Sequence, residues 1–213
     1  NIDVTEGDIA AAVAAKKAEI ETAGDKVGDI TINLTADAAY TVSGSIEAPA
    51  GLVINGNNAT IDASALASAM ILMSATPSVE ANEAGFYPIN DVVIKDVKVT
   101  GLTQQLFYAN KVKYLMNNLV CENSIIQVNG GNKTVFDFNG GGVVAKLDIS
   151  KSTIYANPKH DGALYSSQSG NKATEAGLEK QTISIINSTL YNIACGKNVN
   201  NHRQANQTWL EYI

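Results

Sequence analysis

The chain has 213 residues, of which 45% are apolar and only 17% charged, so it is a folded protein and not a disordered one. Its net charge of −6 and its single arginine, Arg203, exclude the basic clusters that nucleic acids and anionic membrane surfaces attract. The sequence contains no apolar run of the roughly 18 residues that a membrane-spanning helix needs. We therefore predict one domain over residues 1–213, with no nucleic-acid partner and no transmembrane segment.

The two ends of the sequence suggest a piece of a longer protein. The chain begins at Asn1 and not at methionine, which indicates processing or trimming. Residues 208–213 alternate between polar and apolar side chains as a strand does and then stop. Because an open strand would leave an unprotected sheet edge, we expect the natural chain to continue past Ile213.

The first predicted element is an amphipathic helix over about residues 8–22. Apolar side chains recur at helical spacing from Ile9 through Val13 to Ile20. Thr5 and residue 8 resemble a capping box, and Gly24 follows as a helix-ending residue. A short helix of this kind can cover the open end of a repetitive core.

Strands follow the helix. Strict alternation over residues 29–34 predicts a strand, and residues 52–62 predict a strand, a turn and a strand. Ile32 and Ile54 are 22 residues apart, which suits one turn of a three-sided β-helix. The alternative is a type I′ hairpin at Asn55 and Gly56, which would imply an antiparallel sandwich.

Similar segments recur farther along the chain. Residues 147–155 recur at 183–191, so that Ser152 corresponds to Ser188, 36 residues later. Looser copies lie at 93–99 and 115–121, which we align at an offset of 22 residues. Repeats with periods of roughly 20–50 residues indicate stacked structural units. We therefore predict an all-β protein built as a parallel β-helix, with aliphatic side chains stacked inside.

Two segments break this rhythm. Residues 63–90 and 156–180 are irregular, and we interpret each as an insertion in one turn. Insertions leave a repetitive fold at its corners and decorate one side of it, where a ligand would bind.

The opening of the chain resembles a known superfamily. Its Ala-rich helix, followed by residues 28–34, 40–42 and 52–62, resembles the N-terminal cap and first turns of pectate-lyase-like right-handed β-helices, and residues 187–191 fit the same pattern. More narrowly, the chain is similar to pectate-lyase-like β-helix domains in secreted lipoproteins of Gram-negative gut bacteria, which are often linked to glycan-utilisation systems and have no established activity.

The resemblance implies an all-β, right-handed parallel β-helix with an N-terminal helix cap. It also implies a secreted protein or one at the outer-membrane surface. The expected partners are a polysaccharide or a surface glycan-utilisation complex. Because one fold hosts many functions, the resemblance says more about architecture than about activity.

The catalytic motifs of enzymes with this fold are incomplete in the sequence. Lyases of this kind use a basic residue, often with Ca²⁺ held by an Asp cluster, but Arg203 stands without an Asp-rich motif. Hydrolases of this kind carry several short motifs, of which His160 followed by Asp161 and Gly162 is the nearest approach. We therefore predict no catalytic residue, no metal site and no cofactor.

Acid–base chemistry could still come from carboxylates on different turns. Asp96, Asp137 and Asp148 are the candidates, with solvent-facing strand positions as the simpler explanation. Cys121 and Cys195 both have apolar neighbours and are expected to be buried thiols. A disulfide between turns and a metal-binding pair remain the alternatives.

Sugar binding would require exposed aromatic side chains together with amides or carboxylates. Tyr155 and Tyr191 occupy equivalent repeat positions and could form a ladder on one face. The candidate ligand-binding residues lie in or near the irregular segments: Tyr87, His160, Tyr165 and Trp209.

The prediction for function is a secreted or surface-anchored, non-catalytic, glycan-associated protein. The first alternative is a polysaccharide lyase or glycoside hydrolase with a divergent active site. The second is a structural or adhesive solenoid that presents its insertions to another protein. The sequence leaves the ligand, the mode of anchoring and the oligomeric state open.

Overall fold

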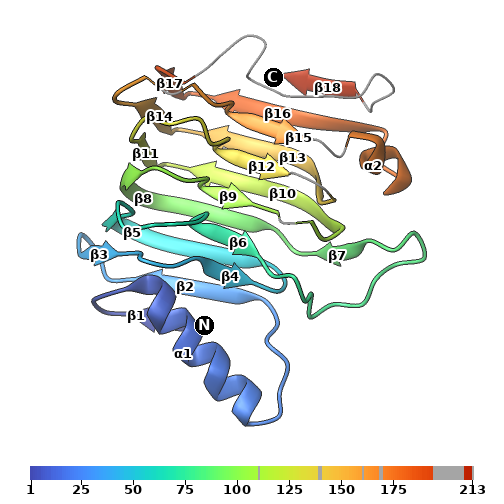
Figure 1. The fold of residues 1–213 in the computed structure, drawn as a ribbon, viewed down its shortest axis with the longest axis horizontal. Coiled ribbons are helices and arrows are strands. Elements are labelled where there is room, and N and C mark those ends of the chain that lie inside the picture. Colours follow the sequence, from blue (N-terminus) through green and yellow to red (C-terminus); the bar gives the residue numbers. More distant parts are fainter. Residues whose placement is uncertain (110, 139–140, 160, 168–169, 194–208, 213) are drawn as a thin grey trace.

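The computed structural model describes residues 1–109, 111–138, 141–159, 161–167, 170–193 and 209–212, with backbone alone for 167, 170–171 and 209–212. Strands are the main regular structure, and they lie in two sheets (Figure 1). The main strands of the first sheet, in their spatial order, are β1 (Ile2–Val4), β2 (Ile30–Leu34), β5 (Leu52–Asp62), β8 (Val92–Leu102), β10 (Tyr114–Glu122), β13 (Val143–Ser150), β16 (Lys180–Ile186) and β18 (Trp209–Tyr212).

Shorter strands extend the first sheet beyond a bend or at its edge. They are β3 (Ala39–Thr41), β7 (Tyr87–Ile89), β11 (Ile125–Val128), β14 (Thr153–Ala156) and β17 (Thr189–Tyr191). The second sheet contains β4 (Ile46–Ala48), β6 (Ile71–Met73), β9 (Phe107–Tyr108), β12 (Phe136–Phe138) and β15 (Tyr165–Ser167).

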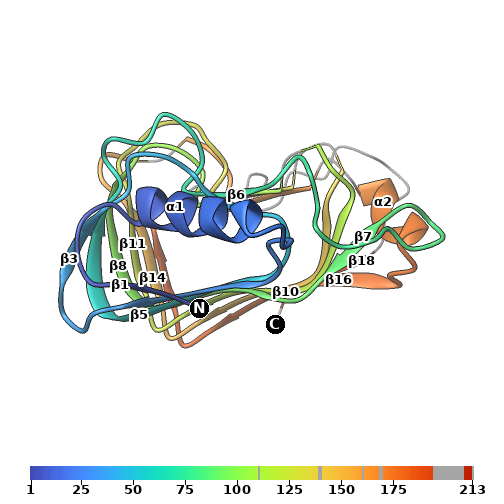
Figure 2. The ribbon, with the colours of Figure 1, turned by 90° about the horizontal axis from the view of Figure 1, so that it is seen from below.

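The chain moves repeatedly from the first sheet to the second and back. In both sheets the strands stand in the order of the sequence, and the paired strands of the described residues are parallel (Figures 1 and 2). We term each stretch from a first-sheet strand to the next second-sheet strand a pass. The protein is therefore an all-β protein of parallel strands, and the antiparallel sandwich is excluded.

The alternative of a hairpin at Asn55 and Gly56 is excluded. Both residues lie inside β5, which pairs in parallel with β8 and shifts its register between Asn55 and Ala59. Asn57 and Asn58 have φ of 50° and 63°, so the strand bends there without reversing. Asparagine tolerates this left-handed conformation, which also occurs in tight turns. An Asn-rich stretch therefore suggests a turn even where the strand only bends.

Two predicted offsets are confirmed and one is wrong. Ile32 pairs with Ile54, and residues 153–155 pair with 189–191. However, Val93 pairs with Val120 and not with Leu115. Asp96 and Asn123 occupy equivalent bends in successive passes, and they lie 27 residues apart and not 22. The predicted alignment superposed apolar residues of the two segments. It did not superpose the residues at which the two strands bend.

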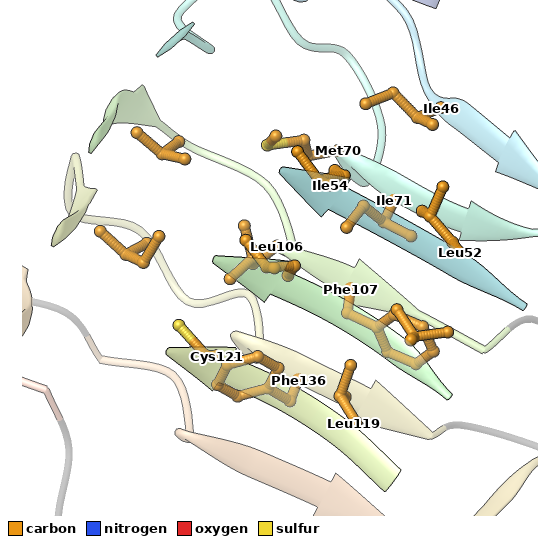
Figure 3. Packing of buried hydrophobic residues seen from close by; sticks show 14 of the residues in the cluster. Ile46, Leu52, Ile54, Met70, Ile71, Leu106, Phe107, Leu119, Cys121 and Phe136 are labelled. Carbon is orange, nitrogen blue, oxygen red and sulfur yellow. The ribbon is translucent and has the colours of Figure 1, made fainter. Parts of the chain in front are cut away.

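The core consists of side chains that repeat from pass to pass. Ile32, Ile54, Ile94, Cys121 and Ile149 follow one another in register on the inner face of the first sheet, all of them buried. On the facing second sheet, a second column packs against them (Figure 3): Ile46, Ile71, Phe107, Phe136 and Tyr165. Because side chains of similar shape stack in successive passes, the interior is closely packed.

The predicted helix is confirmed as α1 (Ile9–Thr22), which lies across the N-terminal end of the core (Figure 2). Its N-cap is Asp8, whose Oδ1 accepts the Ala11 N–H at 2.9 Å, so the expected capping role of Thr5 is wrong. Gly24 has φ of 86° and follows the C-cap residue, as expected.

The predicted insertions are shorter than the sequence suggested. Residues 63–90 include β6 and β7, and residues 156–180 include β15 and the helix α2 (Gly170–Glu175). These short strands have too few residues for a clear alternation. For residues 65–73 the sequence leaves a helical turn or a buried strand open, and the structure shows the strand β6 there. Three buried residues form a small second core: Phe86, Val143 and Ala173. The Lys113 Nζ lies over the Phe86 ring, 5.1 Å from its centroid. Within the described residues, neither α1 nor α2 has the length and apolarity that crossing a membrane demands.

Serine hydroxyls connect successive passes at the bend. The Ser124 Oγ accepts the Val97 N–H at 3.3 Å, and the Ser152 Oγ accepts the Ser124 N–H at 3.1 Å. The Ser188 Oγ in turn accepts the Ser152 N–H at 3.1 Å. These bonds satisfy backbone donors that the left-handed bend residues turn away from the strand ladder.

Candidate functional site

The outer face of the first sheet carries a wide hollow. This hollow, which we term the first-sheet groove, has a volume of about 560 Å³ and crosses β2, β5, β8 and β10. Val53 and Val93, which pair in register and are half-buried, lie along it. Its polar side chains are Asp29, Thr31, Asn90, Asp91, Asn117 and Asn118.

The strand register brings these polar residues together. Each of Asp29, Gly51, Asp91 and Asn118 directly precedes an inward aliphatic residue, and those aliphatic residues pair with one another. Because side chains alternate between the two faces of a strand, the four residues form one outward column. The column is continued by Lys146, which pairs with Asn118.

Asp29 and Asn90 meet across Gly51. Asp29 Oδ1 accepts the Gly51 N–H at 2.8 Å, and Asp29 Oδ2 accepts a hydrogen bond from Asn90 Nδ2. A Cβ at Gly51 would lie 2.9 Å from Asp29 Oδ1 and 3.0 Å from the Asn90 Cβ. The missing side chain of Gly51 therefore makes the room in which this carboxylate and this amide are fixed.

Asp91 is held in a similar way by the next pass. Its Oδ1 accepts both the backbone N–H of Asn118 at 3.2 Å and the side-chain Nδ2 of Asn118 at 3.0 Å. Its Oδ2 has no hydrogen-bond partner among the described residues, and the side chain is half-buried in the groove. Asp91 therefore presents one oriented carboxylate oxygen to a ligand.

This chemistry suits hydroxyl groups more than charged ones. Oriented carboxylate and amide oxygens accept hydrogen bonds from hydroxyls, and the valines offer an apolar floor to the C–H face of a ring. Of the described residues, no Lys or Arg lines the groove. An anionic ligand would therefore meet two carboxylates without a compensating cation.

We compared the chain with known proteins. Residues 12–157 match the family described as Domain of unknown function (DUF4957). The chain belongs to this family. The matched segment of the DUF4957 domain includes every residue of the first-sheet groove. A search of the curated proteins and a search of the solved structures found no match.

Two of the predicted ligand-binding residues of this DUF4957 member have described side chains. Tyr87 lies in β7, half-buried, with its ring centroid 6.3 Å from that of Tyr114. Tyr165 is only 1% exposed and packs on Phe138 at 5.7 Å between ring centroids. The expectation of an exposed Tyr165 is wrong, because β15 continues the inward column of the second sheet.

The other predicted residues are described in part or not at all. The backbone of Trp209 pairs with Lys180 at the end of the first sheet. His160, Arg203 and Cys195 lie outside the described residues. The structure thus brings none of the described candidates into the first-sheet groove.

The three candidate carboxylates lie apart from one another. Asp96 is a bend residue bonded to Asn123, and Asp148 lies in β13 with its Oδ2 2.6 Å from the Lys146 Nζ. Asp137 lies in β12 of the second sheet, where it pairs with Tyr108. These positions give no acid–base pair on a shared substrate.

Two other reactive groups are poorly suited to nucleophilic or basic catalysis. Burial, followed by the charge of Asp137, raises the pKa of Tyr108, so its phenol stays protonated at neutral pH. Burial raises the pKa of Cys121 to about 12, although a hydrogen bond with Ser152 lowers it slightly. The buried Cys121 thiol fills a position that isoleucine occupies in other passes.

The sequence analysis missed Asp29, Asn90, Asp91 and Asn118. The available signal was a polar residue directly before an inward aliphatic residue at Asp29, Asp91 and Asn118. No group of three or more His, Cys, Asp or Glu side chains in the described ranges is arranged to hold a metal ion.

Proposed function

We propose that this DUF4957 protein binds a neutral oligosaccharide in the first-sheet groove without cleaving it. The observation that carries the proposal is the pair of fixed carboxylates, Asp29 and Asp91, beside the valine floor of one groove. The protein would act outside the cell, secreted or at the outer-membrane surface, with a polysaccharide or a surface glycan-utilisation complex as partner.

We infer that the chain forms a right-handed parallel β-helix of the pectate-lyase-like kind. Parallel pairing, the sequential strand order of both sheets and recurring offsets of 22 to 40 residues support this architecture. Helix α1 would be its N-terminal cap. In such a solenoid the outward columns form a long continuous surface, which suits an extended polymer.

The size of the groove favours a short stretch of polymer over a single small molecule. The groove crosses four neighbouring strands, and strand spacing of about 4.8 Å makes it roughly 14 Å long. A few sugar rings fit this length when the polymer runs across the strands. Ring hydroxyls would donate to Asp29 and Asp91, while ring C–H groups would lie on Val53 and Val93.

The test is a substitution that changes one ligand-facing atom. Asp91→Asn keeps an oxygen for the two hydrogen bonds from Asn118 and replaces the free oxygen with an amide nitrogen. Calorimetry against neutral hexasaccharides of glucose, mannose, galactose and xylose should find binding by the wild type. The variant should bind the same sugar about tenfold more weakly, because a hydrogen bond to a charged acceptor is lost.

Asp37→Asn is the matched control, since Asp37 is an exposed bend residue with φ of 56° that asparagine adopts equally well. It should bind as the wild type does. Failure of every neutral sugar to bind, or unchanged affinity in Asp91→Asn, would contradict the proposal. Product analysis after long incubation must also find intact hexasaccharide; new chain ends would indicate the lyase or hydrolase alternative.

A further inference from the structure

A second hollow follows the bend of the first sheet. This corner groove has a volume of about 420 Å³ and crosses β5, β8, β11 and β14. Bend residues form one side of it, and outward residues of the strand segments beyond the bend form the other. Its lining includes Asn58, Asp96 and Asn123 on the first side and Thr60, Lys98 and Ile125 on the second.

The described lining of the corner groove holds two cations, Lys98 and Lys151, and one anion, Asp96. Asp96 Oδ1 accepts a hydrogen bond from Asn123 Nδ2 at 2.6 Å, and the Lys151 Nζ lies 3.6 Å from Glu122 Oε1. Lys98 is exposed and forms no ion pair with any described residue. In a chain with a net charge of −6, a groove with a free ammonium group attracts anions locally.

The neighbours of Lys98 favour a sugar over a bare anion. Ile125 pairs with Lys98 in register and is 42% exposed, so an apolar surface lies beside the ammonium group. Asn58 and Asn123 add amide groups on the opposite side. A polynucleotide would need several cations in a row, and the groove supplies only Lys98 and the already paired Lys151.

We propose that the corner groove binds an anionic sugar, with the Lys98 ammonium contacting a sulfate ester or a carboxylate and Ile125 contacting the ring. This site is separate from the first-sheet groove and does not rest on the function proposed for it. The two grooves would thus select opposite kinds of sugar, a neutral one between carboxylates and an anionic one beside a lysine.

The experiment compares three probes of equal length by calorimetry at low salt. They are a sulfated hexasaccharide, a galacturonic-acid hexasaccharide and an uncharged glucose hexasaccharide. Lys98→Gln should weaken binding of the preferred anionic probe about fivefold, the effect of one exposed charge pair. Raising the salt to physiological strength should weaken wild-type binding in the same direction.

Lys133→Gln is the matched control, because Lys133 is an exposed lysine outside the groove. It should bind as the wild type does. Preference for the sulfated probe identifies a sulfate ester as the ligand group, and preference for the galacturonic-acid probe identifies a carboxylate. Equal affinity of all three probes, unchanged binding by Lys98→Gln or an equal loss in Lys133→Gln would overturn the proposal.

Discussion

The two faces of the first sheet obey different rules. On the inner face the same position holds Ile32, Ile54, Ile94 and Ile149 in successive passes, with Cys121 as the one change of kind among them. On the outer face, one position changes from Asp29 to glycine, aspartate, asparagine and lysine. The inner face repeats because each side chain packs on its copies.

The difference teaches where function can reside in this molecule. Inner positions are constrained by packing with the passes on both sides, so their chemistry is nearly uniform. Outer positions meet solvent and can change at little cost in stability. The chemistry that distinguishes one pass from another, such as the Asp29 and Asp91 carboxylates, is therefore found outside.

Neighbouring residues of β5 give the strongest test of this contrast. Ile54 points inward and is fully buried, whereas Val53 points outward and is half-exposed. Ile54→Ala should lower the free energy of unfolding by about 2–5 kcal/mol, because it leaves a cavity between passes. Val53→Ala should cost below about 1 kcal/mol. Urea unfolding of both variants measures this, and equal costs would break the distinction between the faces.

The serine column at the bend gives an intermediate effect. Ser152 is buried, and its hydroxyl accepts the Ser124 N–H and donates to the Ser150 carbonyl at 2.8 Å. Ser152→Ala should cost about 1–3 kcal/mol, because a buried backbone donor loses its partner. Ser150→Ala, at the outward-facing last residue of β13, is the control and should leave the urea midpoint nearly unchanged. The idea fails if Ser150→Ala is the more destabilising of the two.

The cap of α1 gives the smallest effect and one that depends on pH. Asp8 Oδ1 accepts the Ala11 N–H, and Asp8 Oδ2 accepts the Ser43 N–H at 2.7 Å. Burial raises the pKa of Asp8, but hydrogen bonds from Ala11 and Ser43 outweigh it and hold the pKa below the ordinary 3.8. Asp8→Ala should cost about 1 kcal/mol near neutral pH.

The sign of the pH effect follows from the lowered pKa of Asp8. The stabilisation is present above the ordinary pKa of 3.8 and is lost as the pH falls through the lower pKa of the folded state. Thermal unfolding of wild type and Asp8→Ala should therefore converge in strong acid. Glu6→Ala, an exposed neighbour, should follow the wild type throughout. A stability gap that widens in acid would disprove this role of Asp8.

Much of the architecture could be predicted from local sequence. Helical spacing and Gly24 located α1, and the pairs Ile32–Ile54 and Ser152–Ser188 gave the correct register, because inner positions repeat. The register of β8 with β10 failed where the pass length changed. The strand β15 was not predicted, and β6 was only one of two alternatives, because three residues carry little periodic signal.

The candidate site was much less predictable. Asp29 and Asn90 are 61 residues apart, and nothing local indicates that they meet over Gly51. The aromatic candidates were chosen because irregular segments tend to be exposed, and Tyr165 shows the weakness of that argument, since its strand is part of the core. Correct register is needed before outer residues can be assigned to a shared groove.

The most direct test of the account is a crystal structure of the chain with the neutral hexasaccharide that binds it most tightly. We predict an intact sugar chain across β2, β5, β8 and β10, with hydroxyls bonded to Asp29 and Asp91 and a ring on Val53 or Val93. Sugar density on the second sheet beside Tyr108 and Asp137, or a cleaved product there, would contradict it.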